Sequence, residues 1–205
     1  MSSFSDRIYK GNSLIEDFKD YVVVDIETTS LDHFRDDEIL EISAIRVRDK
    51  KEVKYFSKII KIREEVGCYT TQLTGITSEM VEKEGEDLIK VLKSFQRFVG
   101  KDIIVGHNVN FDINYLYDSM EENLGEYLTN DFVDTLRLSR RLLPEMKHHK
   151  LDDLIDYFHL KRRNEHRALN DCVLTNQLYI KLCKMMKKLN LEKVVQKSIF
   201  YNVEE

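Results

Sequence analysis

The chain has 205 residues, of which 42% are hydrophobic and 34% charged, and its formal net charge at pH 7 is −5. This length and composition allow one domain with a full hydrophobic core. The negative charge argues against a protein that coats nucleic acid through a basic surface, but not against an enzyme that brings metal ions to a polyanion.

Two further features of the composition concern the compartment. No apolar run reaches the roughly 18 residues of a membrane-spanning helix, and the N-terminus has no signal-peptide pattern, so we expect no membrane association. The cysteines Cys68, Cys172 and Cys183 form neither a CxxC pair nor an even disulfide set. We therefore expect reduced thiols and a cytoplasmic location.

The stretch Tyr21–Thr29, with the sequence YVVVDIETT, predicts a buried strand that ends in two acids. Side chains alternate along a strand, so Asp25 and Glu27 point to the same side. Two adjacent carboxylates repel each other, and a divalent metal between them would relieve the repulsion. The alternative is a strand end whose acids face water, and these residues alone do not decide between the two.

The rest of the chain predicts a mixed α/β sheet flanked by helices. Strands over 39–47 and 53–60 are separated by the short turn Asp49–Lys51, which favours an antiparallel hairpin. With the first strand they form a three-stranded meander, and two parallel strands join it through helical crossovers, giving five strands. The two parallel strands are expected at 103–105 and 132–133. Helices are expected at 86–99, 110–124, 135–143, 151–158 and 167–189.

The domain boundaries follow from the same pattern. Residues 1–19 are mixed and polar and are expected to be an N-terminal extension, with a short helix over Leu14–Phe18. Residues 20–189 form the predicted domain, and residues 190–205 form a C-terminal extension. The Lys-rich face of the last helix is most simply solvated.

Two later acids complete the candidate site. Asp112 falls in the first turn of the helix after the fourth strand, where it can approach Asp25 or simply complement the helix dipole. His166 and Asp171 are five residues apart, a rotation of roughly 140° on a helix, so they do not share a helix face. His166 is therefore expected on the loop that enters the last helix, with Asp171 in its early turns.

Taken together, three motifs resemble those of the DEDDh exonucleases, the superfamily that includes the proofreading subunit of bacterial replicative polymerases. The motifs are Asp25–Ile26–Glu27–Thr28–Thr29, His107–Asn108–Val109–Asn110–Phe111–Asp112 and His166–Arg167–Ala168–Leu169–Asn170–Asp171. Ile39–Leu40–Glu41–Ile42, Leu73–Thr74–Gly75–Ile76 and Asp134–Thr135–Leu136 are smaller matches. The chain looks most similar to the proofreading exonucleases, including the type inserted in Gram-positive replicative polymerases. Ser30 departs from the glycine of many relatives, without removing a ligand.

The resemblance implies a ribonuclease H-like fold and metal-dependent hydrolysis of DNA from the 3′ end, which releases nucleoside 5′-monophosphates. It implies two Mg²⁺ or Mn²⁺ ions. Asp25 would bridge both ions, Glu27 and Asp171 would complete the ion that carries the attacking water, and Asp112 would serve the second ion. His166 would take the proton from that water, since an unperturbed histidine titrates at about 6.5.

Substrate contacts are also implied by the resemblance. Thr28, Leu73 and Phe111 would line the pocket of the terminal nucleotide, with ordinary packing as the alternative. Arg167 stands in a basic run with Lys161, which could hold phosphates or be a solvated face. The expected partners are single-stranded DNA or DNA 3′ ends and a DNA polymerase. An exoribonuclease or oligoribonuclease is the main rival, and a non-catalytic nucleic-acid-binding module is a further one.

Other polar residues of the motifs have structural interpretations. His107 and Asn108 are expected to fix the turn between strand and helix. Asp134 is expected to start the following helix. His148 and His149 are expected to be solvated.

Overall fold

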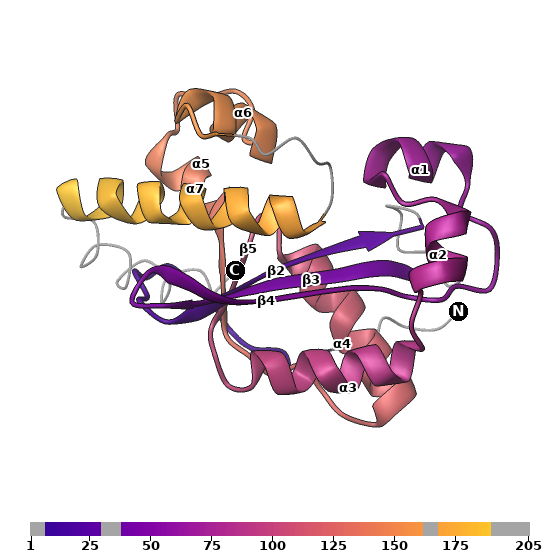
Figure 1. Ribbon diagram of the computed structural model, residues 1–205. Helices are drawn as coiled ribbons and strands as arrows, with labels where there is room; N and C mark the ends of the chain where they lie inside the picture. Colours follow the sequence, from indigo (N-terminus) through magenta and orange to yellow (C-terminus); the bar gives the residue numbers. More distant parts are fainter. Residues whose placement is uncertain (1–6, 30–37, 162–167, 190–205) are drawn as a thin grey trace.

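The computed structural model describes residues 7–29, 38–161 and 168–189, and these form a mixed sheet flanked by helices (Figure 1). The sheet has six strands in the order β1-β6-β5-β2-β3-β4. The strands span Ser13–Leu14 (β1), Tyr21–Thr28 (β2), Ile39–Arg48 (β3), Lys51–Ile59 (β4), Ile104–Gly106 (β5) and Phe132–Asp134 (β6). The helices span Cys68–Thr74 (α1), Ser78–Glu84 (α2), Leu88–Val99 (α3), Asn110–Leu124 (α4), Thr135–Leu142 (α5), Leu151–Tyr157 (α6) and Ala168–Lys188 (α7).

The predicted mixed topology is confirmed. β2, β3 and β4 form an antiparallel meander, while β5 pairs parallel with β2 and β6 pairs parallel with β5. The β3–β4 turn places Asp49 and Lys50 at φ 45° and 61°. Positive φ at both central residues is what a tight hairpin turn needs to match the twist of its strands.

A sixth strand, β1, was not predicted. Ser13 and Leu14 pair parallel with β6, although they fall in the predicted N-terminal extension. The helix expected over Leu14–Phe18 is wrong, because α7 holds this backbone in another conformation. The Tyr179 hydroxyl donates to the Glu16 carbonyl at 2.7 Å and accepts from the Phe18 N–H at 3.0 Å. The boundary at residue 20 stays a prediction.

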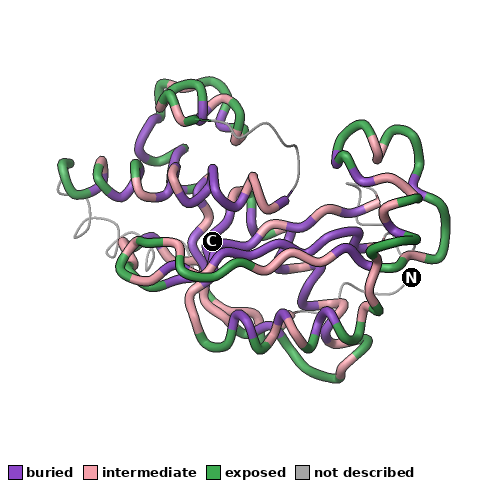
Figure 2. The backbone as a smooth tube through the Cα atoms, viewed as in Figure 1, coloured by how far each residue is buried: buried purple, intermediate pink, exposed green. Residues whose placement is uncertain are grey.

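The sheet separates two hydrophobic layers (Figures 1 and 2). On one face, Val22 and Val24 of β2 pack in the cluster that includes residues of α3 and α4. On the other face, Tyr21 and Val23 pack in the cluster that includes residues of α5, α6 and α7. Because β2 is covered on both faces, its apolar residues run continuously instead of alternating with polar ones. The acids at the end of β2 therefore lie at the end of a strand that is buried on both faces.

The helix α1 was also not predicted, because its seven residues show no apolar periodicity. It ends at Gly75, whose φ of 71° lies in the left-handed region and whose N–H bonds to the Thr71 carbonyl. The Thr70 hydroxyl donates to the carbonyl of Thr29 at 3.0 Å, which ties α1 to the end of β2. α2 begins after Thr77, whose side chain accepts a hydrogen bond from the Met80 N–H.

Among the helices that the structure describes, none combines the length and the apolar character needed to cross a membrane.

Candidate metal centre and substrate site

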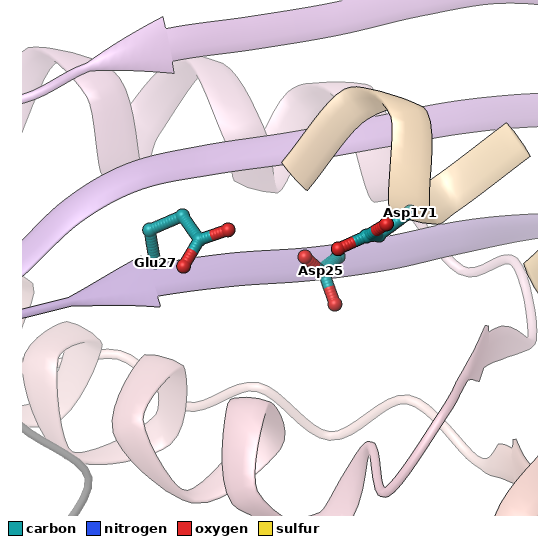
Figure 3. Close-up of side chains that lie close together, drawn as sticks. All are labelled: Asp25, Glu27 and Asp171. Atoms are coloured by element: carbon teal, nitrogen blue, oxygen red, sulfur yellow. The ribbon is translucent and has the colours of Figure 1, made fainter. Parts of the chain in front are cut away.

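Three carboxylates meet where β2 passes beneath the start of α7 (Figure 3). Asp25 and Glu27 come from β2, and Asp171 comes from the first turn of α7. One carboxylate oxygen of each lies within 4.8 Å of those of the other two. The Glu27 carboxylate is turned toward Asp25 and Asp171 in Figure 3. Strand alternation predicted the first two positions, and packing of α7 on β2 brings the third to them.

Asp112 reaches the same strand end from the other face of the sheet. It lies in the first turn of α4, is buried, and its Oδ1 accepts a hydrogen bond from the Ile26 N–H at 3.0 Å. Ile26 stands between Asp25 and Glu27, so Asp112 is fixed beside both acids. It is not one of the three residues whose ligand atoms converge within 4.8 Å. The charge of Asp112 nevertheless raises the pKa of Asp25, which agrees with the expected approach of the two residues.

The carboxylates raise one another's pKa. Burial raises the pKa of Asp25 well above its ordinary value, and the charges of Asp112 and Glu27 raise it further. Burial, with the charge of Asp171 next, raises the pKa of Glu27 to about 8. Burial raises the pKa of Asp112 to about 7, against the lowering effect of the Ile26 hydrogen bond. Acids arranged in this way hold protons or cations, and their oxygen atoms are the donors that Mg²⁺ and Mn²⁺ prefer.

Glu41 is a fifth acid at this place, and sequence reasoning assigned it no role. It lies on β3 directly opposite Glu27 and is fully buried. Its Oε1 accepts hydrogen bonds from the Ser57 hydroxyl at 2.6 Å and the Ser43 hydroxyl at 3.2 Å. An acid inside the mostly apolar stretch Ile39–Ile45 was the available signal, because such an acid is rarely buried without a reason.

The predicted substrate residues that can be located lie on three elements around the acids. Thr28 is buried at the end of β2, and Phe111 lies in the first turn of α4, with its ring 4.8 Å from that of Tyr115. Leu73 is 50% exposed on α1, and Tyr69, one turn earlier on that helix, is 70% exposed. Tyr69 was not predicted, because α1 itself was not.

His166 and Arg167 lie outside the described residues, in the segment 162–167 before α7. The predicted base and the predicted phosphate contact therefore stay predictions. What the structure gives is the start of α7 at Ala168, which is buried, with Asp171 one turn further on.

Asp134 and His107, which were expected to have structural roles, make hydrogen bonds that agree with those roles. Asp134 accepts from the Leu136 N–H and the Asn108 N–H, both at 2.9 Å, so it caps α5 and holds the turn before α4. His107 Nδ1 lies 2.9 Å from the Thr135 hydroxyl. Burial lowers the pKa of His107 to about 4, so its ring is neutral and contributes no cation to the site.

His149 corrects a prediction. It was expected to be solvated, but its Nδ1 lies 3.1 Å from the Ser139 hydroxyl and its Nε2 lies 3.2 Å from the Met146 carbonyl, and the residue is buried. The connection after α5 folds back over the helix, which a polar sequence does not reveal. His148 is exposed, as expected.

Comparison with known proteins places this geometry in context. The RNase_T family model, described as Exonuclease, matches residues 22–179. The chain is 38% identical over 180 residues to the DNA polymerase III PolC-type of Latilactobacillus sakei subsp. sakei (strain 23K), covering 86% of this chain and 12% of the relative. The chain thus spans about an eighth of the length of such curated relatives.

Two solved structures share the fold. Exonuclease X in complex with 5′ overhanging duplex DNA has a TM-score of 0.62 and 25% identity, covering 82% of this chain and 92% of that one. E. coli Exonuclease I in complex with a dT13 oligonucleotide has a TM-score of 0.70 and 18% identity, covering 84% of this chain and 42% of that one. At 18% identity the second likeness concerns the fold alone.

Proposed function

Since this chain belongs to the exonuclease family, we propose that it hydrolyses DNA from the 3′ end and releases nucleoside 5′-monophosphates. The family membership confirms the resemblance predicted from the three motifs. The observation that carries the proposal is the convergence of Asp25, Glu27 and Asp171 at the end of the central strand, with Asp112 beside them. Clustered carboxylates that hold divalent cations are suited to the hydrolysis of a phosphodiester.

The site is proposed to hold two Mg²⁺ or Mn²⁺ ions, because every donor is a carboxylate oxygen. Such ions, when bound, stabilise the charge on the attacking and leaving oxygens. Asp25, at the centre of the acid group, would contact both. Glu27 and Asp171 would complete the site of the ion that carries the attacking water. Asp112 would contribute to the site of the second ion, beside the leaving group.

His166 is proposed as the general base. It precedes α7 by two residues and Asp171 by five, so the helix that carries a carboxylate into the site also begins near the base. A histidine with a pKa near 6.5 accepts a proton at neutral pH. The proposal rests on this proximity in sequence and on the motif, and a pH–rate profile of His166→Ala tests it. Loss of the limb near pH 6.5 is expected, and an unchanged profile would exclude the role.

The terminal nucleotide is proposed to lie between α1 and α4. Tyr69 and Leu73 are four residues apart and so share one face of α1, where both are exposed. Exposed aromatic and apolar side chains take unpaired bases by stacking. Phe111 and Thr28 would close the pocket from α4 and β2, and Arg167 would contact a phosphate.

DNA is preferred over RNA as substrate because the relatives that match most of this chain are named as DNA polymerases. An exoribonuclease with the same acids is the second candidate, since the ligand set does not distinguish the two polymers. The single most informative experiment is a digestion ladder on 3′- and 5′-labelled DNA and RNA oligonucleotides with Mg²⁺ or Mn²⁺. A large preference for RNA, or degradation from the 5′ end, would overturn the proposal.

The context of the domain is proposed from the same relatives. Because the chain matches one part of PolC-type polymerases, a role in proofreading beside a DNA polymerase is proposed, with 20–189 as the exonuclease domain. Co-purification with a replicative polymerase tests the partnership. A reduced, cytoplasmic setting agrees with the free cysteines Cys68, Cys172 and Cys183. A non-catalytic module, the remaining alternative, predicts DNA binding without hydrolysis in the same ladder.

A further inference from the structure

We propose that Glu41 is a positioning residue of the metal centre, which directs the Glu27 carboxylate toward Asp25 and Asp171 and strengthens the binding of divalent cations. This inference rests on the proposed function, because it assumes that the acid group binds metal. Glu41 itself is not assigned as a ligand. Its role follows from where the sheet places it and from what holds it there.

The register of the sheet puts two carboxylates side by side. Glu41 on β3 is the direct antiparallel partner of Glu27 on β2. Residues paired in this way have Cβ atoms about 4.5–5.5 Å apart on the same face of the sheet, and like charges there destabilise the pair. This is the face covered by α7, on which Asp171 lies. The sheet thus carries a repulsive pair at the most buried side of the site.

Glu41 is more deeply buried than Glu27 and is held by hydrogen bonds. The carboxylate of Glu41 is fully buried and is fixed by the hydroxyls of Ser57 and Ser43, which donate to its Oε1. Glu27 is only partly buried, and its carboxylate is turned toward Asp25 and Asp171. Repulsion from this fixed neighbour disfavours orientations of the Glu27 carboxylate that point toward β3. A cation bound among the acids would outweigh the repulsion by Asp25 and Asp171 and hold Glu27 in the orientation of a ligand.

The charge of Glu41 acts on two other acids of the site, Glu27 and Asp25. After burial and the charge of Asp171, Glu41 contributes to the raised pKa of Glu27, and it also contributes to that of Asp25. A group that disfavours extra negative charge on its neighbours favours a cation among them by the same interaction. Residues behind a metal ligand commonly change metal affinity about 10- to 100-fold when they are replaced.

The test compares the Mn²⁺ affinity of four proteins without DNA, by isothermal titration calorimetry, together with their melting temperatures in EDTA. Glu41→Gln keeps the shape and removes the charge. Glu79→Gln, an exposed acid in the first turn of α2, is the matched control for the loss of one charge. Asp25→Asn reports on the metal site itself, and unchanged protein is the reference.

For Glu41→Gln we expect Mn²⁺ affinity to fall about 10-fold or more while the melting temperature in EDTA stays equal or rises. A role in packing alone gives the opposite pattern, namely unchanged affinity with a lower melting temperature, and would overturn the inference. If Asp25→Asn also leaves the affinity unchanged, the metal site is wrong. If Asp25→Asn abolishes binding and Glu41→Gln does not weaken it, only the inference fails.

A second variant decides the matter if Glu41→Gln does not fold. Ser57→Ala keeps all charges but removes the 2.6 Å hydrogen bond that the Ser57 hydroxyl donates to Glu41 Oε1. A freed Glu41 carboxylate directs Glu27 less well, so a weaker Mn²⁺ affinity is expected, smaller in effect than that of Glu41→Gln. An affinity equal to that of the unchanged protein would overturn the positioning role.

Discussion

A single acid lies near one end of α7 and a group of acids near the other, and their surroundings are opposite in charge. Near its C-terminal end, Asp17, whose side chain is 5% exposed, pairs with Lys187 at 2.6 Å and with Lys50. Near its N-terminal end, Asp171 meets Asp25 and Glu27, which are other acids. Asp17 joins separate segments of the chain through its ion pairs. The acids around Asp171 repel one another, and a bound cation would relieve that repulsion.

The pKa directions express the same difference. Burial favours the protonated form of Asp17, but hydrogen bonds from Lys187 and Lys50 outweigh it and hold its pKa below the ordinary value. At the other end, burial and neighbouring carboxylates both raise the pKa of Asp25. A buried acid with cations is a structural element, and a buried acid among acids is a candidate for chemistry. Neutralising one acid at each end in turn should therefore have opposite effects on stability and on metal binding.

The largest effect is expected from Asp25→Asn. Removing this carboxylate should lower exonuclease activity more than about 1000-fold, since metal stabilisation of the reacting oxygens is worth several kcal/mol. The melting temperature in EDTA should stay the same or rise, because one repulsive charge is gone. A gel assay with a labelled oligonucleotide measures the first quantity and circular dichroism the second. Retained hydrolysis would exclude the proposed mechanism.

Asp17→Asn should do the reverse. It leaves Lys50 and Lys187 without their shared acceptor charge, and the cost is expected to be about 2–3 kcal/mol of unfolding free energy. Urea denaturation measures it. Mn²⁺ affinity of the folded protein should not change, because Asp17 contacts the opposite end of the helix from Asp171. A stability equal to that of the unchanged protein would show that the ion pairs of Asp17 do not stabilise the fold.

The local parts of this picture were predictable from the sequence. Alternation along one strand fixed the common direction of Asp25 and Glu27, and helix periodicity placed Asp171 in an early turn. Asp112 was expected in a first turn and is found there, bonded to the Ile26 N–H. Each of these inferences needs only the geometry of one element.

The remaining parts depend on how elements meet, and no local pattern encodes that. Glu41 stands opposite Glu27 only because of the register between β2 and β3. Asp17 meets Lys50 and Lys187 from two distant segments of the chain. The two-residue strand β1 is too short for periodicity, and beside its pairing with β6 the preceding residue Asn12 bonds to Asp131 and Phe132, which are distant in sequence.

The two ends should respond oppositely to pH in the metal-free protein. Glu27 has a folded pKa of about 8 against an ordinary 4.5, so the folded state binds the extra proton between these values and stability is lost as the pH rises through them. Asp112 acts in the same direction between 3.8 and about 7. Asp17, with its lowered pKa, contributes stability that is lost only as the pH falls below its ordinary value of 3.8.

Melting temperatures between pH 5 and pH 8 in EDTA should therefore fall by several degrees, and excess Mn²⁺ should flatten the curve by replacing the protons. Glu27→Gln should make the fall smaller without metal, because one of the titrating groups is absent while Asp112 still titrates. A melting temperature that rises through this range in EDTA would contradict the raised pKa values of Glu27 and Asp112.

The smallest effect is expected from Tyr179→Phe, which tests whether the structural end acts independently of the site. The Tyr179 hydroxyl joins the Phe18 N–H to the Glu16 carbonyl, and its loss should cost about 1 kcal/mol of unfolding free energy. Tyr179 lies two turns of α7 beyond Asp171, so Mn²⁺ affinity and the rate at saturating DNA should be unchanged. A drop in Mn²⁺ affinity would mean that the contact of Glu16 and Phe18 with α7 influences the position of Asp171 on that helix. The two ends of α7 would then be coupled, because a rigid helix transmits a shift at one end to the other.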